Sequence, residues 1–127
     1  MKDPYEKLLS RKRKWTPVKP KAGVFKTGAA ETIRRALAIR HMELPVGEFI
    51  KEGLEKDVPK NARKLLEDNV VDEIRHDIAL QYIVDAHGAD TQAENEAMRL
   101  RDAWIGHPDH TITKALVAER AIFFVLL

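Results

Sequence analysis

Apolar residues recur with a helical period along the body of the chain, from residue 29 onward. They return every three to four positions, and no stretch shows the two-residue alternation of an exposed strand. This pattern predicts an all-α fold with four helical segments. The segments run from about Ala29 to Leu44 with a continuation after Pro45 to about Lys56, from Lys60 to Ala86, from Gln92 to Ile105, and from Pro108 to the end.

Local signals mark the ends of these helices. Pro59 suits the first turn of the second helix, and Gly88 suits its end because glycine adopts a positive φ without strain. Thr91 with Glu94 three residues later forms a capping box that begins the third helix. Pro45 leaves two possibilities for the first helix, which either continues through it with a kink or breaks there.

Charged residues fall inside the apolar arc of the helices when successive residues are placed 100° apart. Glu73 lies within the arc of the second helix with His76 at its edge, and Glu119 lies in the middle of the apolar face of the last helix. Burying a carboxylate costs several kcal/mol unless a cation or hydrogen bonds compensate for the lost hydration. Glu73 and His76 are three residues apart, so their side chains lie side by side and can approach one ion.

The first helix carries a third candidate. Glu43 shares its apolar face if Pro45 does not rotate the second half of the helix away, and Glu48 is the competing residue if it does. The alternative to metal binding is a set of buried hydrogen-bonded pairs, in which Arg40 neutralises a carboxylate from another helix.

Three predicted helices thus each bring a carboxylate inward, one of them as Glu-x-x-His. Bundle proteins bind a carboxylate-bridged pair of metal ions with ligands of this kind. In Glu43, segment 72–77 and segment 118–124 the chain resembles the ferritin-like superfamily of di-iron carboxylate proteins. These segments are more similar to the ribonucleotide reductase small subunits and the monooxygenases than to ferritin itself.

The resemblance implies a ferritin-like helical bundle over residues 29–127 that holds two iron or two manganese ions. Glu43, Glu73 and His76 would bind one ion, and Glu73 or Glu119 would bridge to the second. It also implies oxygen or iron chemistry of the oxidoreductase type, although whether this chain is itself an enzyme stays open.

A complete site in this family has a second Glu-x-x-His on a fourth core helix, and none follows Glu119 in this sequence. We therefore expect a further segment or a second copy of the chain to complete the site. The third possibility is a relative that kept the bundle and lost the metal. The apolar residues 121–127 predict a docking face, and hence a homo-oligomer or a larger assembly.

Charge is distributed unevenly. Residues 1–26 hold nine Lys or Arg against two Asp or Glu, a net charge of +7, whereas the rest of the chain has a net charge of −5. With three prolines, residues 1–28 are predicted to form an extended basic arm. We expect this arm to contact nucleic acid or an acidic partner, which includes the acidic body of a neighbouring subunit. The contacting residues would be Arg11, Lys12, Arg13, Lys14 and the stacking residue Trp15. A solubilising tail without a target is the alternative.

Composition excludes several classes of site. The absence of cysteine excludes disulfides, Cys-ligated zinc, iron–sulfur clusters and thiol nucleophiles, and no apolar run is long enough to span a membrane. We expect a location in the cytoplasm or within an intracellular or viral particle. The competing function is a non-enzymatic assembly protein of a nucleoprotein or viral particle, which docks through its bundle and binds nucleic acid or an acidic partner through its arm.

Overall fold

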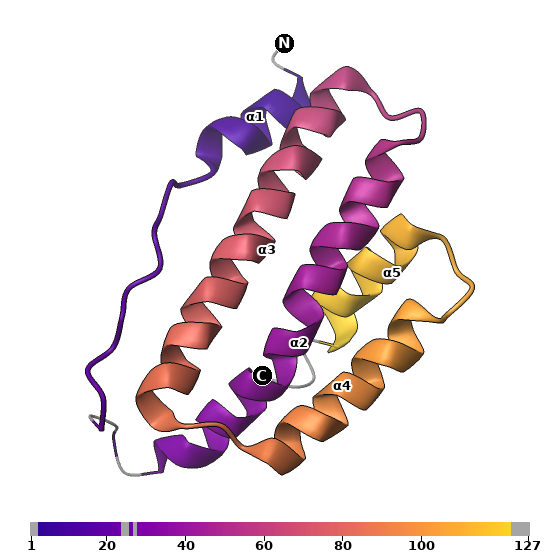
Figure 1. Cartoon of the computed structure of the whole chain (residues 1–127). Coiled ribbons are helices and arrows are strands. Elements are labelled where there is room, and N and C mark those ends of the chain that lie inside the picture. Colours follow the sequence, from indigo (N-terminus) through magenta and orange to yellow (C-terminus); the bar gives the residue numbers. More distant parts are fainter. Residues whose placement is uncertain (1–2, 24–25, 27, 123–127) are drawn as a thin grey trace.

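The computed structural model describes residues 3–23, 26 and 28–122, and within them it contains helices and no strands (Figure 1). The predicted all-α class is therefore confirmed. The elements are α1 (Pro4–Arg11), α2 (Ala29–Leu54), α3 (Lys60–His87), α4 (Thr91–Ile105), α5 (Thr111–Val117) and the π-helical turn η1 (Ala118–Ile122).

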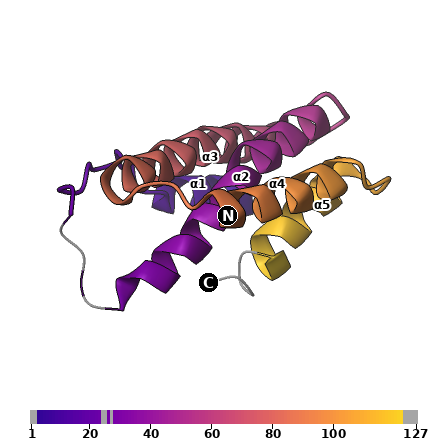
Figure 2. The same ribbon diagram turned by 60° about the horizontal axis from the view of Figure 1, so that its bottom comes forward.

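Helix α2 is the centre of the fold. It packs against α3 on one side and α4 on the other, and α5 also packs on it (Figure 1). Figure 2 shows α5 and η1 on one side of the layer formed by α2, α3 and α4. Helices α3 and α5 thus both pack on α2, and the face of α2 between them forms the floor of a cavity described below.

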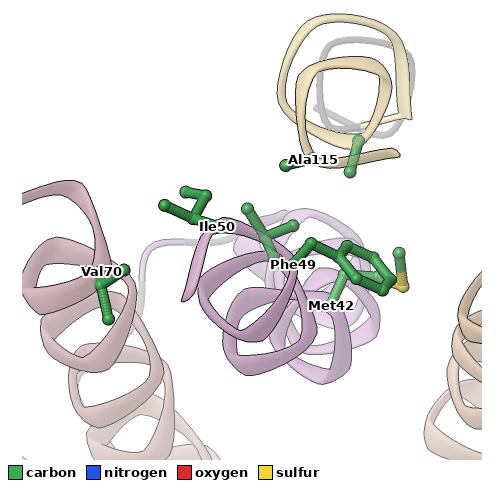
Figure 3. Packing of buried hydrophobic residues seen from close by; sticks show 7 residues of the cluster. Met42, Phe49, Ile50, Val70 and Ala115 are labelled. Carbon is green, nitrogen blue, oxygen red and sulfur yellow. The ribbon is translucent and has the colours of Figure 1, made fainter. Parts of the chain in front are cut away.

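The core is built largely from one face of α2. Its buried apolar side chains meet Val70 of α3 and Ala115 of α5, and Figure 3 shows Ile50 pointing between α2 and α3. Each large apolar side chain buried in this way contributes about 1.5–3 kcal/mol. The α2 residues of this cluster are Met42, Val46, Phe49 and Ile50.

Helix α2 continues through Pro45, which resolves the two possibilities for the first helix. Proline has no N–H group, so the carbonyl of His41 has no helical donor at this point, at a cost of about 3 kcal/mol. The burial of Val46 and Phe49 directly after the proline offsets this cost. Glu43 and Ile50 consequently remain on the inner side of one continuous helix.

The ends of the central helices follow the predicted signals with small shifts. Pro59 immediately precedes α3, and Gly88 ends it with a φ of +96°. The predicted Thr91 capping box is wrong by one position, because Asp90 caps α4 by accepting a hydrogen bond from the Ala93 amide at 3.0 Å. A carboxylate one residue earlier already satisfies a free amide of the first turn.

The last helix is shorter than predicted. Its start is at Thr111 rather than near Pro108, because the His110 ring accepts a hydrogen bond from the Ile112 amide at 3.2 Å and so caps the helix there. From Ala118 the winding is π-helical, so the prediction of one regular helix to the end is wrong for this turn. The rest of the predicted docking face, residues 123–127, lies outside the described residues.

The basic arm is not extended throughout. Residues Pro4–Arg11 form α1, because Asp3 accepts a hydrogen bond from the Tyr5 amide at 2.8 Å and Pro4 suits the first helical position. Asp3 also accepts a hydrogen bond from Asn61 at 2.8 Å, which joins α1 to α3. Residues 12–20 have neither helix nor strand, and the arm runs beside α3 (Figure 1). Among the described residues, no helix is both long enough and apolar enough to cross a bilayer.

Candidate metal centre

Two helices bring three potential metal ligands together. Glu43 of α2 and Glu73 and His76 of α3 each offer one atom, and these atoms lie within 4.8 Å of one another. The His76 Nδ1 atom is 3.3 Å from a Glu43 carboxylate oxygen and 3.4 Å from a Glu73 carboxylate oxygen. Glu43 and Glu73 are buried, with 7% and 5% of their surface exposed.

A glycine permits this close approach of α2 and α3. Gly47 lies one turn after Glu43, and a Cβ atom at this position would be 3.4 Å from the Glu73 Cβ. The backbone of α2 therefore lies against the side chain of Glu73. Because that side chain leaves α3 facing the backbone of α2 and is buried, its carboxylate is directed into the space between the helices rather than into solvent.

Contacts within the cluster shift the pKa values of Glu73 and His76 strongly. Burial raises the pKa of Glu73 to about 6, with the adjacent Glu43 adding to the rise and His76 opposing it. The carboxylates of Glu43 and Glu73 raise the pKa of His76 to about 10, and burial opposes that shift only in part. Without a metal ion, a protonated His76 is thus the cation that compensates two buried carboxylates.

The protonated imidazole leaves one oxygen unsatisfied. The buried Glu43 Oε2 atom lies at ion-pair distance from His76 but has no hydrogen-bond partner among the described residues. Two ligands that are each about 2.1 Å from one ion lie no more than roughly 4.2 Å apart, so the 4.8 Å cluster needs only a small movement to close around an ion. Two carboxylates and one imidazole suit Fe(II) or Mn(II), so this donor set fits the metal that the ligand pattern implies.

Glu119 approaches the same cluster from the opposite side. It lies on η1 at the edge of a cavity, where its surface is partly exposed rather than fully buried as the helical wheel predicts. Partial burial raises the pKa of Glu119, the charge of Glu73 adds to the rise, and His76 opposes it. Glu119 lines a cavity that is open to solvent, which leaves its side chain exposed although it faces α3. Its π-helical turn is of a rare kind that often occurs at functional sites.

A cavity of about 410 Å³ separates α3 from α5 and η1. One wall holds the potential ligands Glu73 and His76, the opposite wall holds Glu119 and Arg120, and Ile50 of α2 forms the floor. The other lining residues are Leu66, Asn69, Asp72, Ile112, Ala115 and Leu116. The cavity therefore has acidic groups on both walls and apolar side chains between them.

Two alternatives raised by the sequence are not realised at this cluster. Glu48 points outward with 67% of its side chain exposed and pairs with Lys51. Arg40 does not neutralise Glu119, because it hydrogen-bonds to Gln81 and lies 3.6 Å from Asp77. A hydrogen-bonded Glu–His cluster describes the metal-free state, whereas a Glu–Arg pair with Arg40 does not form.

Two of the five predicted arm residues lie at the site. Lys12 pairs with Asp68 at 2.7 Å and with Asp72 at 2.8 Å, and the Trp15 ring stacks on His76 with the ring centroids 5.5 Å apart. Arg11, Arg13 and Lys14 are exposed. The acidic surface that the arm meets is thus on its own chain.

Sequence reasoning missed Asn69 and Asp72, which line the cavity beside Glu73 and His76. The four residues occupy positions i, i+3, i+4 and i+7, so they form one polar stripe along α3. This spacing was the available signal. The contact of Trp15 with His76 had no such signal, because it depends on how the arm lies against α3.

Comparisons of the chain with protein-family models, with curated proteins and with solved structures give no match, so its function is inferred from the residues and geometry of this centre.

Proposed function

We propose that this protein binds divalent metal as a ferritin-like carboxylate protein, with a di-iron or di-manganese centre that carries out oxygen or iron chemistry of the oxidoreductase type. The observation that carries the proposal is the cluster of Glu43, Glu73 and His76, in which a buried carboxylate oxygen lacks a hydrogen-bond donor. Natural structures rarely leave such an atom without a partner, and a bound metal ion would coordinate it while replacing the His76 proton as the compensating charge.

Each residue has a distinct part in the proposed centre. Glu43 and His76 would bind one ion from α2 and α3. Glu73 would lie between the two ion positions, because it is paired with His76 and its charge also raises the pKa of Glu119. Glu119 would bind the second ion from η1. The exposure of Glu119 is consistent with a ligand whose position is set when the metal arrives.

The described residues supply four of about six side chains that a site of this class uses. The remaining Glu-x-x-His would come from a further segment or from a second copy of the chain. The cavity between α3 and α5 supports this proposal, because it is an open space beside the ligands that no described helix fills and that a further helix could cover. Leu116 has 58% of its surface exposed at this cavity, and such a helix would cover it.

Iron or manganese bound here would supply the redox chemistry, and the residues of the chain would control access to it. The apolar walls formed by Leu66, Ile112 and Leu116 would keep bulk water away from the ligands. Arg120 at the rim would attract anionic or polarised groups.

Metal analysis tests the proposal. Protein purified with Fe(II) or Mn(II) should contain about one to two ions per completed site, and Glu73→Gln and His76→Ala should lose them while keeping the wild-type circular dichroism spectrum. Glu48→Gln is the matched control, because it changes an exposed glutamate of α2 and should leave the metal content unchanged. A folded wild type that binds neither metal contradicts the proposal.

A second candidate is a non-enzymatic assembly protein that contacts nucleic acid or an acidic partner through the arm, in the cytoplasm or in a viral or other intracellular particle. The observation that favours it is the exposure of Arg11, Arg13 and Lys14 while Lys12 anchors the arm on α3.

Substitution of these three residues separates the two functions. If the arm binds DNA or RNA, Arg11→Ala, Arg13→Ala and Lys14→Ala together should weaken binding and flatten its salt dependence, by about 0.9 in the log–log slope for each phosphate that the arm no longer neutralises. Metal content should not change. Nucleic-acid affinity that is identical in the triple variant refutes the role of the arm.

A further inference from the structure

We infer that Trp15 is a positioning residue for His76, held over the imidazole by the Lys12 anchor, so that docking of the N-terminal arm on α3 sets the affinity of the metal centre. This inference rests on the proposed function. It assigns Trp15 a task within the chain in place of stacking on a nucleic acid base.

The contact between Trp15 and His76 restrains the imidazole from one side. The two ring planes are inclined by 24°, with centroids 5.5 Å apart, which is a stacked geometry. His76 is the most exposed member of the Glu43–Glu73–His76 cluster, with 42% of its side chain open to solvent. Its ring can turn away from the carboxylates unless something holds it, and Trp15 covers the ring in the orientation that directs Nδ1 at Glu43 and Glu73.

Lys12 fixes the arm at the point where this restraint is needed. Its ammonium group lies 2.7 Å from an Asp68 oxygen and 2.8 Å from an Asp72 oxygen, and it donates a hydrogen bond to Asn69 at 2.6 Å. Burial lowers the pKa of Lys12, but the two carboxylates outweigh this effect and raise it.

The anchor and the stacked ring lie close together along both the arm and α3. Only two residues separate Lys12 from Trp15, and one helical turn separates Asp72 from His76. The anchor therefore delivers the indole to the imidazole over a short segment with little freedom. Asn69 and Asp72 also line the cavity, so the anchored arm borders the proposed centre directly.

The arm offers a matched control farther along. Lys19 lies over the Tyr82 ring, with its ammonium group 5.1 Å from the ring centroid. Tyr82 is not among the residues that line the cavity. Lys19→Ala therefore removes one positive charge from the same arm, as Lys12→Ala does, without removing an anchor beside the metal centre.

The test measures Mn(II) affinity and the visible absorption spectrum of bound Co(II) in the full chain. Trp15→Ala should weaken Mn(II) binding about tenfold, as loss of a residue that orients a ligand commonly does, and should change the Co(II) spectrum. Trp15→Phe should restore both, because phenylalanine retains a stacking face.

Lys12→Ala should weaken binding by roughly two- to fivefold at low salt, and this difference should vanish near 1 M NaCl, where the screening length is about 3 Å. Lys19→Ala should match the wild type.

The outcomes distinguish this inference from the proposed function. A wild type that binds no Mn(II) or Co(II) overturns both. A wild type that binds metal with the same affinity and the same Co(II) spectrum as Trp15→Ala overturns the positioning role alone. The stacking itself has a metal-free readout, since the His76 Cε1 proton should carry a ring-current shift in NMR spectra that disappears in Trp15→Ala; its absence also overturns the inference.

Discussion

Gly47 of α2 lies directly against Glu73 of α3, where an added Cβ atom would be 3.4 Å from the Glu73 Cβ. The side chain of Glu73 therefore leaves α3 facing the backbone of Gly47. Gly53, six residues later, faces Ile112 of α5 much more tightly: a Cβ there would be 2.3 Å from Ile112 Cδ1 and 2.6 Å from Cγ1. The two glycines of one helix thus have different amounts of room.

This difference predicts opposite effects for two identical substitutions. Gly47→Ala places a methyl group in ordinary contact and removes a poor helix former, so the free energy of unfolding should stay unchanged or rise by up to about 1 kcal/mol. Gly53→Ala forces Ile112 to move and should lower it by about 1–3 kcal/mol. Chemical denaturation measures both. Adding Ile112→Ala should remove most of the penalty of Gly53→Ala, and a double-mutant cycle without coupling would contradict the assigned contact.

Replacing Glu43 should weaken metal binding more than it destabilises the metal-free protein. Glu43→Gln removes the buried oxygen that has no hydrogen-bond donor, and it removes the carboxylate that contributes most to the raised pKa of His76. We expect the unfolding free energy of the metal-free protein to fall by about 1 kcal/mol, and its affinity for Fe(II) or Mn(II) to fall as well. Thermal unfolding with and without metal measures both changes. A variant that loses stability but keeps the wild-type metal affinity would show that Glu43 is a structural partner of His76 rather than a ligand.

Helical periodicity predicts the fold class and the inward positions well, because packing on one face of a helix is a local property of the sequence. It predicts α3 within about a residue at each end, and it directs Glu43 and Glu73 inward. It does not decide whether the helix continues through Pro45 or breaks there. The burial of Val46 and Phe49 stabilises α2 at this point, and that burial depends on contacts with α3 and α5.

Features that depend on contacts between distant segments are not visible in the periodicity. The arm reads as an extended tail, whereas α1 forms because Asp3 caps it and pairs with Asn61, which is 58 positions away. Glu119 faces inward as the wheel predicts, but it is exposed because it lines a cavity that no described segment fills. The sequence therefore predicts the ligand types but not the arrangement of Trp15 and Glu119 around them.

The pKa shifts predict that metal-free protein loses stability as pH rises. The folded-state pKa of His76 is about 10, above its ordinary value of 6.5, so the folded chain holds this proton more tightly than the unfolded chain. Its contribution is fully present below pH 6.5 and is lost as pH rises toward 10. The pKa of Glu73, raised from 4.5 to about 6, acts in the same direction between these two values.

Denaturation between pH 5 and pH 10 measures this dependence. His76→Gln should flatten the upper part of the profile, because the group that binds the additional proton is gone. Added Mn(II) should reverse the trend, since the ligands bind metal only when deprotonated, so that the stabilisation by metal increases with pH. A wild-type profile that rises toward pH 10 without metal would contradict the position of His76 between the two carboxylates.

Buried Lys114 should be required for the junction of α4 and α5. Its ammonium group donates hydrogen bonds to the carbonyl oxygens of Ile105 and His107, each at 3.0 Å, and lies 4.4 Å from the centroid of the Phe49 ring. Lys114→Met keeps the length of the side chain but leaves both carbonyls without this donor, so the free energy of unfolding should fall by about 2–4 kcal/mol.

Lys51→Met is the matched control, because Lys51 is exposed and pairs with Glu48 on the surface, where such pairs contribute no more than about 1 kcal/mol. Ala115, the residue after Lys114, lines the cavity. Lys114→Met should therefore also weaken metal binding by loosening α5, whereas Lys51→Met should leave it unchanged. Equal stability losses in the two variants would mean that the buried ammonium group does not hold this junction.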